Sequence, residues 1–379
     1  MTRFAVINTD NTAPLIAALG NACDALTTSG TKDEKVDASL AHIAERNATR
    51  RAIRYPWLFG NTVVKAIYTS IYGRKIRRQY AALYEQLAID TSRTALVFNG
   101  FLAPNALVDH AAQALGMKRL YLENGFFPGT LQADRAGING LSTLPRNPAF
   151  YDALSDAEAG ADWPEDFEVR KSKLQAKGPN RTLPDRFIFV PFQVPSDMQI
   201  LALSPWIQNM EALHNEVRDL AAAFPEKHFV IKEHPSFPRS VQDHVIKMPN
   251  IHFANHAVTR ELLEACDGVI TVNSTVGLEA LVLGKKLITL GNAHYAINGL
   301  VCQADNSSDL HQAFSGLDSW EPNIKRRERF IRFVYNRFLI PGDRKAPCAN
   351  TITALKARTA NNDVYSKLIS EASHATPSD

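Results

Sequence analysis

The stretch that decides the fold is Gly268-Val-Ile-Thr-Val-Asn-Ser-Thr-Val-Gly-Leu-Glu-Ala-Leu281. Its apolar, β-branched start predicts a buried strand over 268–272, and a helix over 276–283 follows almost at once. A helix start offers unpaired N–H groups and the positive end of the helix dipole, and the hydroxyls of Ser274 and Thr275 add donors. The pattern predicts a phosphate site. The alternative is that Ser274 or Thr275 only caps the helix.

Strand-length apolar runs alternate with helical patterns on both sides of this stretch. The alternation predicts parallel α/β sheets, and in the second half an open doubly wound sheet that binds ligands beyond the C-terminal ends of its strands. The expected strands are 4–7, 94–98, 119–122, 186–190, 228–232, 250–253, 268–272 and 286–290. The expected helices are 15–26, 106–115, 260–265 and 276–283, with a further helix capped by Ser204.

Two such halves predict an α/β fold of GT-B architecture, in which two Rossmann-like domains face each other across a cleft. We expect a first Rossmann-like domain over 1–180, which ends in a charged linker, and a second Rossmann-like domain over 181–324 that contains the predicted phosphate site. Residues 325–379 are expected to form a helical segment that packs back on the body and ends in a frayed tail.

Composition limits the function classes. The chain has 379 residues and a net charge of +3, which is too small to predict nucleic-acid binding. It contains no Asp-x-Asp run for a metal-bound sugar diphosphate and no Gly-rich nucleotide loop, so we expect neither a metal nor another cofactor. No apolar run approaches the length of a membrane span, and the four cysteines form no paired motif. We therefore expect a cytoplasmic protein whose membrane contact is peripheral.

Three more strand ends carry polar groups. His234, with Lys232 and Pro235, ends the strand before it and is suited to a phosphate oxygen; the alternative is a structural histidine. Asp197 follows another strand and suits attack on a sugar carbon or a hydrogen bond to a hydroxyl, whereas the alternative is a turn cap. Glu123 ends a strand in the first half, and paired carboxylates are the usual apparatus of glycosyl chemistry.

The segment 50–78 is basic and aromatic. It contains eight basic residues and no acidic one, with five aromatic residues interleaved. We interpret it as a patch for an anionic membrane surface, where each basic residue adds about 1 kcal/mol. The alternative is a solvated basic face.

The chain resembles the bacterial capsule-polysaccharide β-Kdo glycosyltransferases, where Kdo is 3-deoxy-D-manno-oct-2-ulosonic acid. The resemblance covers about half of the chain, and its motifs are specific only in combination. These motifs are Glu123-Asn-Gly125, Gly137-Ile-Asn-Gly-Leu-Ser-Thr-Leu-Pro-Arg-Asn-Pro-Ala-Phe-Tyr151, Gln193-Val-Pro-Ser-Asp-Met-Gln-Ile200, Ile231-Lys-Glu-His-Pro235, Thr271-Val-Asn-Ser-Thr-Val-Gly277 and Gly291-Asn-Ala-His-Tyr-Ala-Ile-Asn-Gly-Leu300.

The resemblance implies a GT-B fold, a CMP-β-Kdo donor and retention of configuration through an Asp adduct. It implies that Asp197 is the nucleophile, that Glu123 is the acid/base and that His234 stabilises the leaving phosphate. The implied CMP contacts are Lys232, His234, Pro235, Asn273, Ser274, Thr275 and Glu279. The implied Kdo contacts are Gln193, Gln199, Asn124, Arg146, Asn292 and Tyr295.

We therefore expect transfer of Kdo to a lipid-linked or polysaccharide acceptor in capsule or lipopolysaccharide assembly, at the inner face of the inner membrane. Assembly proteins of that pathway are the expected protein partners. Three alternatives stay open at this point: a CMP-sialic acid transferase, a sugar-nucleotide epimerase of similar fold, and a non-catalytic scaffold of an assembly complex.

Overall fold

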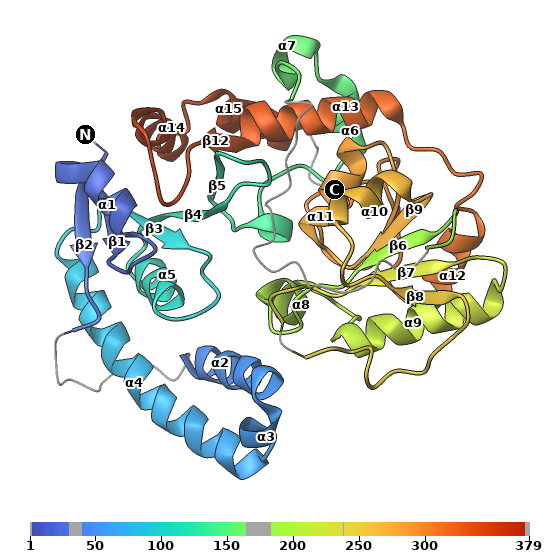
Figure 1. Ribbon diagram of the computed structural model, residues 1–379. Helices are drawn as coiled ribbons and strands as arrows, with labels where there is room; N and C mark the ends of the chain where they lie inside the picture. Colours follow the sequence, from blue (N-terminus) through green and yellow to red (C-terminus); the bar gives the residue numbers. More distant parts are fainter. Residues whose placement is uncertain (1, 30–39, 164–182, 238, 376–379) are drawn as a thin grey trace. The chain divides into compact units, whose positions relative to one another are not determined.

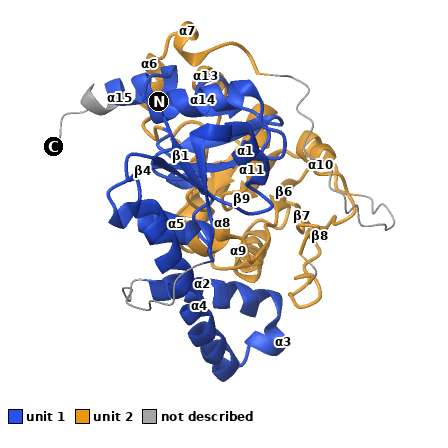
Figure 2. Ribbon diagram, turned by 90° about the vertical axis from the view of Figure 1, so that its left-hand side faces the viewer, with its two compact units in different colours: residues 1–144, 334–379 blue, residues 145–333 orange. Residues whose placement is uncertain are grey.

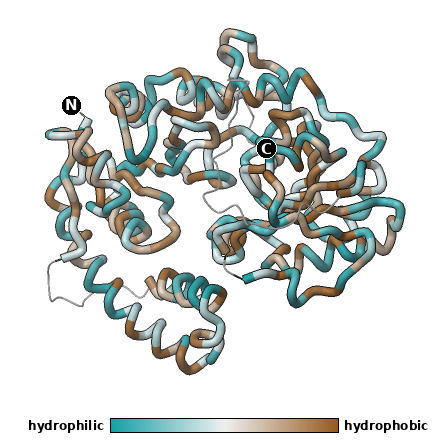
Figure 3. The backbone as a smooth tube through the Cα atoms, in the orientation of Figure 1, coloured by the Kyte–Doolittle hydropathy of each residue, from teal (hydrophilic) through white to brown (hydrophobic). Residues whose placement is uncertain are grey.

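The structure is a computed structural model that describes residues 2–29, 40–163, 183–237 and 239–375 (Figure 1). The chain forms two compact units (Figure 2). The first contains residues 1–144 and 334–379, and the second contains residues 145–333. Each unit is built on a six-stranded sheet. In Figure 3 the most hydrophobic stretches include strands of both sheets, as expected for strands buried on both faces.

The sheet of the second unit is parallel throughout. Its order is β11-β10-β9-β6-β7-β8, so that the first strand of the unit, β6, lies in the middle and the strand order reverses between β6 and β9. This is the Rossmann order. The strands are β6 (Ile188–Pro191), β7 (Phe229–Lys232), β8 (Ile251–Phe253), β9 (Gly268–Thr271), β10 (Lys286–Thr289) and β11 (Cys302–Gln303).

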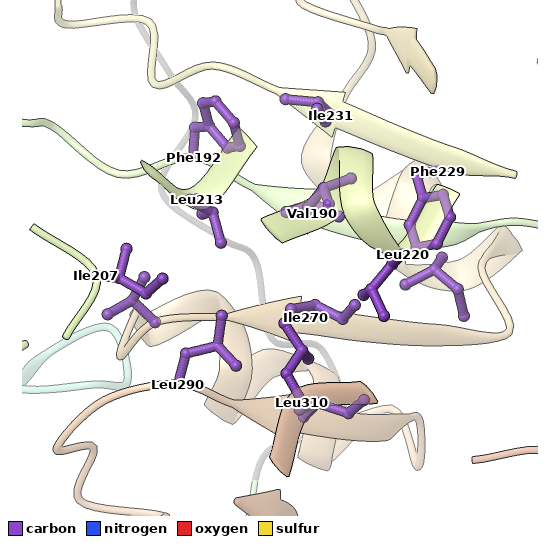
Figure 4. Close-up of a cluster of buried hydrophobic side chains, with 14 of the residues drawn as sticks. Val190, Phe192, Ile207, Leu213, Leu220, Phe229, Ile231, Ile270, Leu290 and Leu310 are labelled. Atoms are coloured by element: carbon purple, nitrogen blue, oxygen red, sulfur yellow. The ribbon is translucent and has the colours of Figure 1, made fainter. Parts of the chain in front are cut away.

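Helices cover this sheet because alternate strand residues point to opposite faces. Strand residues such as Val190, Ile231 and Ile270 pack with Leu213 and Leu310 in one buried cluster (Figure 4). Leu213 belongs to α9 (Met210–Ala223) and Leu310 to α12 (Ser307–Ser315). Helix α11 (Thr275–Val282) contacts β9 and β10, and α10 (Thr259–Ala265) links β8 to β9. A short helix, α8 (Met198–Leu203), follows β6.

The first unit has a mixed sheet of order β12-β5-β4-β3-β1-β2. Its four parallel strands are β1 (Phe4–Ile7), β2 (Cys23–Leu26), β3 (Thr94–Phe98) and β4 (Lys118–Asn124), and the antiparallel β5 (Thr130–Asp134) joins β4 to β12 (Leu339–Pro341). Leucines of α1 (Ala13–Leu19) and α14 (Ala349–Thr359) share a core cluster with the sheet. Helix α5 (Asn105–Ala114) contacts β3 and β4.

A helical hairpin extends from the first unit (Figure 1). It consists of α2 (Ala41–Arg54), the one-turn helix α3 (Pro56–Phe59) and the long helix α4 (Thr62–Ala88), and α4 packs on both α2 and α5. Side chains buried in the hairpin include Ile43, Ala48 and Ile76.

The chain crosses between the units at 144/145 and 333/334, which differs from the expected division. The expected boundary at 180/181 lies outside the described residues. Helices α6 (Pro148–Ala153) and α7 (Asp156–Ala159) belong to the second unit because they pack on α13 (Ile324–Phe333), where Arg326 donates to both carboxylate oxygens of Asp152, at 2.8 and 2.5 Å.

The expected C-terminal segment is divided between the units. After α13, a π-helical turn (Val334–Phe338), β12, α14 and α15 (Val364–Ala375) return to the first unit. Buried Arg358 holds this return in place because its guanidinium donates to the carbonyls of Ala133, Arg337 and Phe338.

Two expected elements were wrong. The helix expected over 15–26 ends at Leu19, a 3₁₀ turn (Gly20–Ala22) follows, and β2 then pairs in parallel with β1, because a short apolar run suits a helix and a strand equally well. Ser204 does not start a helix. It follows the end of α8, and Asn209 caps α9 by accepting the backbone N–H of Ala212 at 2.8 Å.

Candidate active site

Most of the predicted polar residues lie at one edge of the second sheet. β6 is followed by the loop 192–197, β7 by 233–237, β9 by 272–274 and β10 by 290–297. All four strands are parallel, so these loops share the C-terminal edge. The strand order reverses between β6 and β9, and ligands of doubly wound sheets bind at such a switch point. The fold thus brings together motifs that are far apart in the sequence.

Gln193 and Asn273 join the loops that follow β6 and β9. Gln193 Nε2 donates to Asn273 Oδ1 at 2.9 Å, and the Asn273 backbone N–H donates to Gln193 Oε1 at 3.2 Å. Asn273 Nδ2 also donates to the carbonyls of Gln199 and Leu203, at 2.8 and 3.2 Å. Both amides are buried. The pair thus links the loop that carries Asp197 to the end of β9, and the contacts of Gln193 with Kdo and of Asn273 with CMP stay predictions.

Ser274 caps helix α11, as the alternative interpretation has it. Its hydroxyl accepts the Val276 N–H at 3.2 Å, and Thr275 begins the helix with an exposed side chain. Tyr295 is fully buried and donates to the Ser274 carbonyl at 2.6 Å. Its ring fills the space beside Gly277, where a Cβ would overlap it. Tyr295 therefore supports the start of the helix instead of facing a sugar, as the sequence led us to expect.

His234 and Lys232 lie at the end of β7. The Ser236 N–H donates to His234 Nδ1 at 3.2 Å, which places the proton of the neutral ring on Nε2. Although His234 is exposed, the protein atoms packed around its ring lower its pKa; the Asp197 carboxylate raises the pKa, and the Lys232 ammonium lowers it further. Burial also lowers the pKa of Lys232. Asp197 and Lys232 thus both lie close enough to His234 to affect its charge, and the neutral ring of His234 offers an Nε2–H donor. Pro235 is the next residue in the chain.

Glu233 organises the loop that carries His234. Its carboxylate accepts the Ser240 hydroxyl at 2.6 Å, Asn255 Nδ2 at 2.8 Å and the Val241 N–H. A carboxylate that accepts three hydrogen bonds fixes the backbone around it. The position of His234 is therefore set by contacts outside its own motif.

Asp197 is exposed and caps α8, so the cap interpretation is confirmed. Its Oδ1 accepts the Gln199 N–H at 2.9 Å, while Oδ2 makes no hydrogen bond within the described ranges. The neighbouring Gln199 Oε1 and Ser196 Oγ are buried and have no hydrogen-bond partner in the part of the chain that the structure describes. A cap uses one carboxylate oxygen and leaves the other available, so the nucleophile role of Asp197 stays a prediction.

Two further expected Kdo contacts, Asn292 and Arg146, are found at the loop after β10. Asn292 is exposed, and its backbone N–H donates to the Leu203 carbonyl at 3.0 Å, which links this loop to α8. Arg146 donates to the carbonyl of His294. Burial lowers the pKa of His294, and the positive charge of Arg146 lowers it further. Arg146, which lies shortly before α6, therefore contacts the same loop that carries Asn292.

Glu279, an expected CMP contact, is buried in α11. Burial raises its pKa to about 7, and the positive charge of Arg260 opposes the shift. Its Oε2 has no hydrogen-bond partner among the described residues. Glu279 also raises the pKa of Tyr295, so the two groups lie close together. At a pH well below 7 the Glu279 carboxyl is protonated. The start of α11 near Ser274 then has no negative charge from this side chain beside it.

Glu123 and Asn124 lie in the first unit, at the C-terminal end of β4. Glu123 Oε2 accepts Asn99 Nδ2 at 2.7 Å, and Oε1 accepts the backbone N–H and Nδ2 of Asn124, at 2.8 and 3.1 Å. Asn99 has a φ of 68°, which turns the chain at the end of β3. These bonds orient the Glu123 carboxylate at the edge of the sheet, and they make Asn124 a partner of that carboxylate.

Arg344, which the sequence did not single out, adds a positive charge near this edge. Its guanidinium carbon lies 5.2 Å from the centroid of the Phe98 ring, and Phe98 directly precedes Asn99. Its Nε is buried with no hydrogen-bond partner in the described ranges. Arg344 follows β12, far along the chain from β3 and β4, so no local pattern could have connected it with Glu123.

A cavity of about 610 Å³ lies elsewhere in the second unit, beside β8 and α10, and none of the predicted site residues line it. In the described part of the chain, no group of three His, Cys, Asp or Glu side chains is placed to hold a metal ion. Nor does any helix of those residues combine the length and apolar character needed to cross a bilayer.

Known proteins resemble the chain in sequence and in fold. The family model described as "Capsule polysaccharide biosynthesis protein" matches residues 166–319. Protein FixF of Sinorhizobium fredii is 41% identical over 307 residues, which cover 79% of this chain and 74% of FixF. Capsule polysaccharide export protein KpsS of Escherichia coli is 24% identical, over 59% of this chain and 72% of KpsS. The solved structure of Thermosulfurimonas dismutans KpsC, beta Kdo 2,7 transferase, has a TM-score of 0.50 and 15% identity, over 90% of this chain and 92% of that one.

The two Rossmann-like units define an α/β protein of the GT-B class, and the likeness to KpsC is a likeness of fold. The chain belongs to the capsule polysaccharide biosynthesis family and is a relative of FixF. The expected fold class and the capsule-family membership are thereby confirmed.

Proposed function

We propose that the protein is a retaining β-Kdo glycosyltransferase that transfers Kdo from CMP-β-Kdo to a lipid-linked or polysaccharide acceptor in capsule or lipopolysaccharide assembly. The observation that carries the proposal is the shared position of Asp197, His234 and Ser274 at the switch point of the second sheet. A nucleophilic carboxylate, a neutral donor for a phosphate and a helix start meet there. The likeness in fold to KpsC, a beta Kdo 2,7 transferase, supports the choice of sugar.

In the first step, an oxygen of the Asp197 carboxylate attacks C2 of Kdo. The bond from C2 to the phosphate oxygen breaks, and CMP leaves with the electron pair. His234 Nε2–H and the N–H groups at the start of α11 donate to the phosphate, where negative charge develops. Lys232 adds a positive charge. The product is a Kdo ester of Asp197, and the configuration at C2 is inverted once.

In the second step, the acceptor hydroxyl oxygen attacks C2 from the face that CMP has left. The ester bond to Asp197 breaks, and Glu123 takes the proton of the acceptor hydroxyl. The second inversion restores the original configuration. Glu123 suits this role because its carboxylate is oriented by Asn99 and Asn124.

We place the reaction at the inner face of the inner membrane, where a lipid-linked acceptor is available to a peripheral cytoplasmic protein. Capsule or lipopolysaccharide assembly proteins are the proposed partners. We propose that no metal or other cofactor takes part, because the leaving group is CMP, a nucleoside monophosphate, and its single phosphate is one that His234, Lys232 and the α11 start suffice to stabilise.

The test compares a conservative change at Asp197 with the loss of a comparable helix cap elsewhere in the second unit. Asp197→Asn keeps an N-cap for α8 but removes the nucleophile, so it should bind CMP normally and lose transfer about 10⁴-fold or more. Asn306→Ala removes a comparable cap, on α12 in the same unit, and should leave transfer intact. Intact-protein mass spectrometry of the parent with CMP-Kdo and a slow acceptor should show one Kdo on the peptide that contains Asp197.

The donor is tested separately with CMP-Kdo, CMP-sialic acid and UDP-N-acetylglucosamine. Transfer from CMP-Kdo alone is the expected result. Turnover of the UDP-sugar without an acceptor would make the chain an epimerase. Full activity of Asp197→Asn, or a Kdo adduct on another residue, would overturn the proposed mechanism.

A further inference from the structure

The outer surface of the α2–α4 hairpin is unusually apolar for a solvent-facing surface. Thirteen large apolar side chains are exposed in the described part of the chain, and six of them lie between residues 55 and 71. Their exposed fractions are 41% for Tyr55, 75% for Trp57, 50% for Leu58, 63% for Val63, 56% for Ile67 and 61% for Ile71. A concentration of this kind on a surface indicates a docking site.

The apolar and basic residues follow one line along α4. Val63, Ile67 and Ile71 recur every fourth residue and therefore share a helix face. Continuing along that face, Arg74 follows Ile71 after three residues and is exposed. At about 1.5 Å per residue, the three apolar side chains span about 12 Å along the helix axis, and Arg74 lies about 5 Å beyond Ile71. The tip of the hairpin, α3 and the start of α4, thus carries exposed apolar side chains with Arg54 and Lys65 close by in the sequence, and a second basic group, Arg74 to Arg78, follows farther along α4.

The hairpin is preorganised, so this exposure is a property of its folded form. Asn61 caps α4 by accepting the N–H groups of Val63 and Val64, at 2.9 and 3.2 Å. The Tyr68 hydroxyl donates to Asn47 Oδ1 of α2 at 2.7 Å. The Arg51 guanidinium carbon lies 5.0 Å from the centroid of the Tyr68 ring. Tyr68 thus turns inward, while Val63, Ile67 and Ile71 of the same helix are exposed.

We propose that this hairpin inserts its apolar tip into the headgroup layer of an anionic lipid membrane. Charge complementarity selects lipid as the occupant, because residues 50–78 contain eight basic residues and no acidic one. Interfacial helices bury their apolar face about 5–10 Å deep and keep Lys and Arg at the phosphates. Trp57 and Tyr55 are residue types that favour the membrane–water interface. The inference deepens the proposed peripheral location and rests on it for the identity of the membrane.

Vesicle flotation tests the proposal with the full chain, using phosphatidylcholine vesicles with and without phosphatidylglycerol. The parent should float with the anionic vesicles, and salt should weaken this binding. A triple variant with Val63→Ser, Ile67→Ser and Ile71→Ser should bind at least about 100-fold more weakly. The matched control is Ile89→Ser, at a residue that is 81% exposed beyond the end of α4, and it should bind like the parent.

Charge and depth are measured independently of the triple variant. Neutralising Arg74, Lys75 and Arg77 with Gln should weaken anionic-vesicle binding about 50-fold or more, whereas Lys118→Gln, elsewhere on this unit, should not. Trp57 fluorescence should shift to the blue on anionic vesicles and be quenched by brominated lipid chains, and Trp57→Phe should remove that part of the signal.

Three results would overturn the proposal. One is vesicle binding by the triple variant that equals the parent's. Another is Trp57 emission that vesicles leave unchanged. The third is a parent that is a dimer and a triple variant that is a monomer but still binds vesicles, since the apolar face would then bind a second copy of the chain. Transfer to a water-soluble acceptor should be the same for all of these variants, so failure of the membrane proposal and failure of the proposed transferase activity are distinguishable.

Discussion

Replacing Asn273 with Ala should loosen the candidate site and lower stability together. The change removes three side-chain hydrogen bonds, made with Gln193 Nε2 and with the carbonyls of Gln199 and Leu203. The Leu203 carbonyl still accepts the Asn292 N–H, whereas the buried Gln193 Nε2 and the partly buried Gln199 carbonyl each lose a hydrogen bond. At about 1 kcal/mol per bond plus the penalty for buried groups left unpaired, we expect a loss of about 2–4 kcal/mol.

The Gln193–Asn273 pair also permits a double-mutant cycle. Gln193→Met keeps the side-chain volume and removes the same contact from the other side. If the two amides satisfy each other, the double variant should be more stable than the sum of the single losses predicts, by about 1–2 kcal/mol. Urea unfolding followed by circular dichroism measures all four free energies of unfolding.

The functional consequence separates positioning from simple destabilisation. The Asp197 loop is held to β9 by Asn273, so Asn273→Ala should lower kcat for Kdo transfer about 10- to 100-fold, with a smaller change in KM for the acceptor. Asn250→Ala is the matched control, because Asn250 is equally buried and Nδ2 donates to the carbonyls of Ala221 and Lys227, at 2.9 and 3.0 Å. The Asn250→Ala variant should lose a similar free energy of unfolding and keep the kcat of the parent. Equal kcat values for the two folded variants would refute the positioning role of Asn273.

Further changes test the interior of the second unit. Gly277→Ala should destabilise the protein by about 1–3 kcal/mol, measured by thermal unfolding, because the new Cβ overlaps the Tyr295 ring. Burial lowers the pKa of His214, so the unfolded chain binds more protons and stability should fall as the pH drops below about 6.5; His214→Phe should reduce that fall in urea titrations at several pH values. Burial raises the pKa of Glu279 to about 7, so this group has the opposite effect on stability. Its contribution to the free energy of unfolding is fully present below about pH 4.5 and is lost as the pH rises through 7. The stability of Glu279→Gln relative to the parent should therefore increase by about 3 kcal/mol between pH 4 and pH 8. Chelation with EDTA should leave transfer unchanged, and a loss that added metal restores would contradict the metal-free proposal.

Local patterns were enough to predict the framework of the fold. The strands expected over 4–7 and 94–98 match β1 and β3, and those expected over 186–190 and 268–272 match β6 and β9 to within two residues. Strands buried on both faces are continuous apolar runs, and the polar residues that end them are visible in the sequence. For that reason the loops of His234, Asp197 and Ser274 were also predicted to be at strand ends.

The tertiary structure alone decided what those residues do. Gln193 and Asn273 lie 80 positions apart, and Tyr295 lies 21 positions from the carbonyl that it supports. Such pairs leave no periodic signal, because each residue type suits a ligand contact and an internal hydrogen bond equally well. The apolar line of α4 is a similar case, since Val63, Ile67 and Ile71 have the spacing of a core-facing helix. Only the fold shows which face of α4 the body of the unit covers and which face it leaves exposed, because burial depends on contacts between distant segments of the chain.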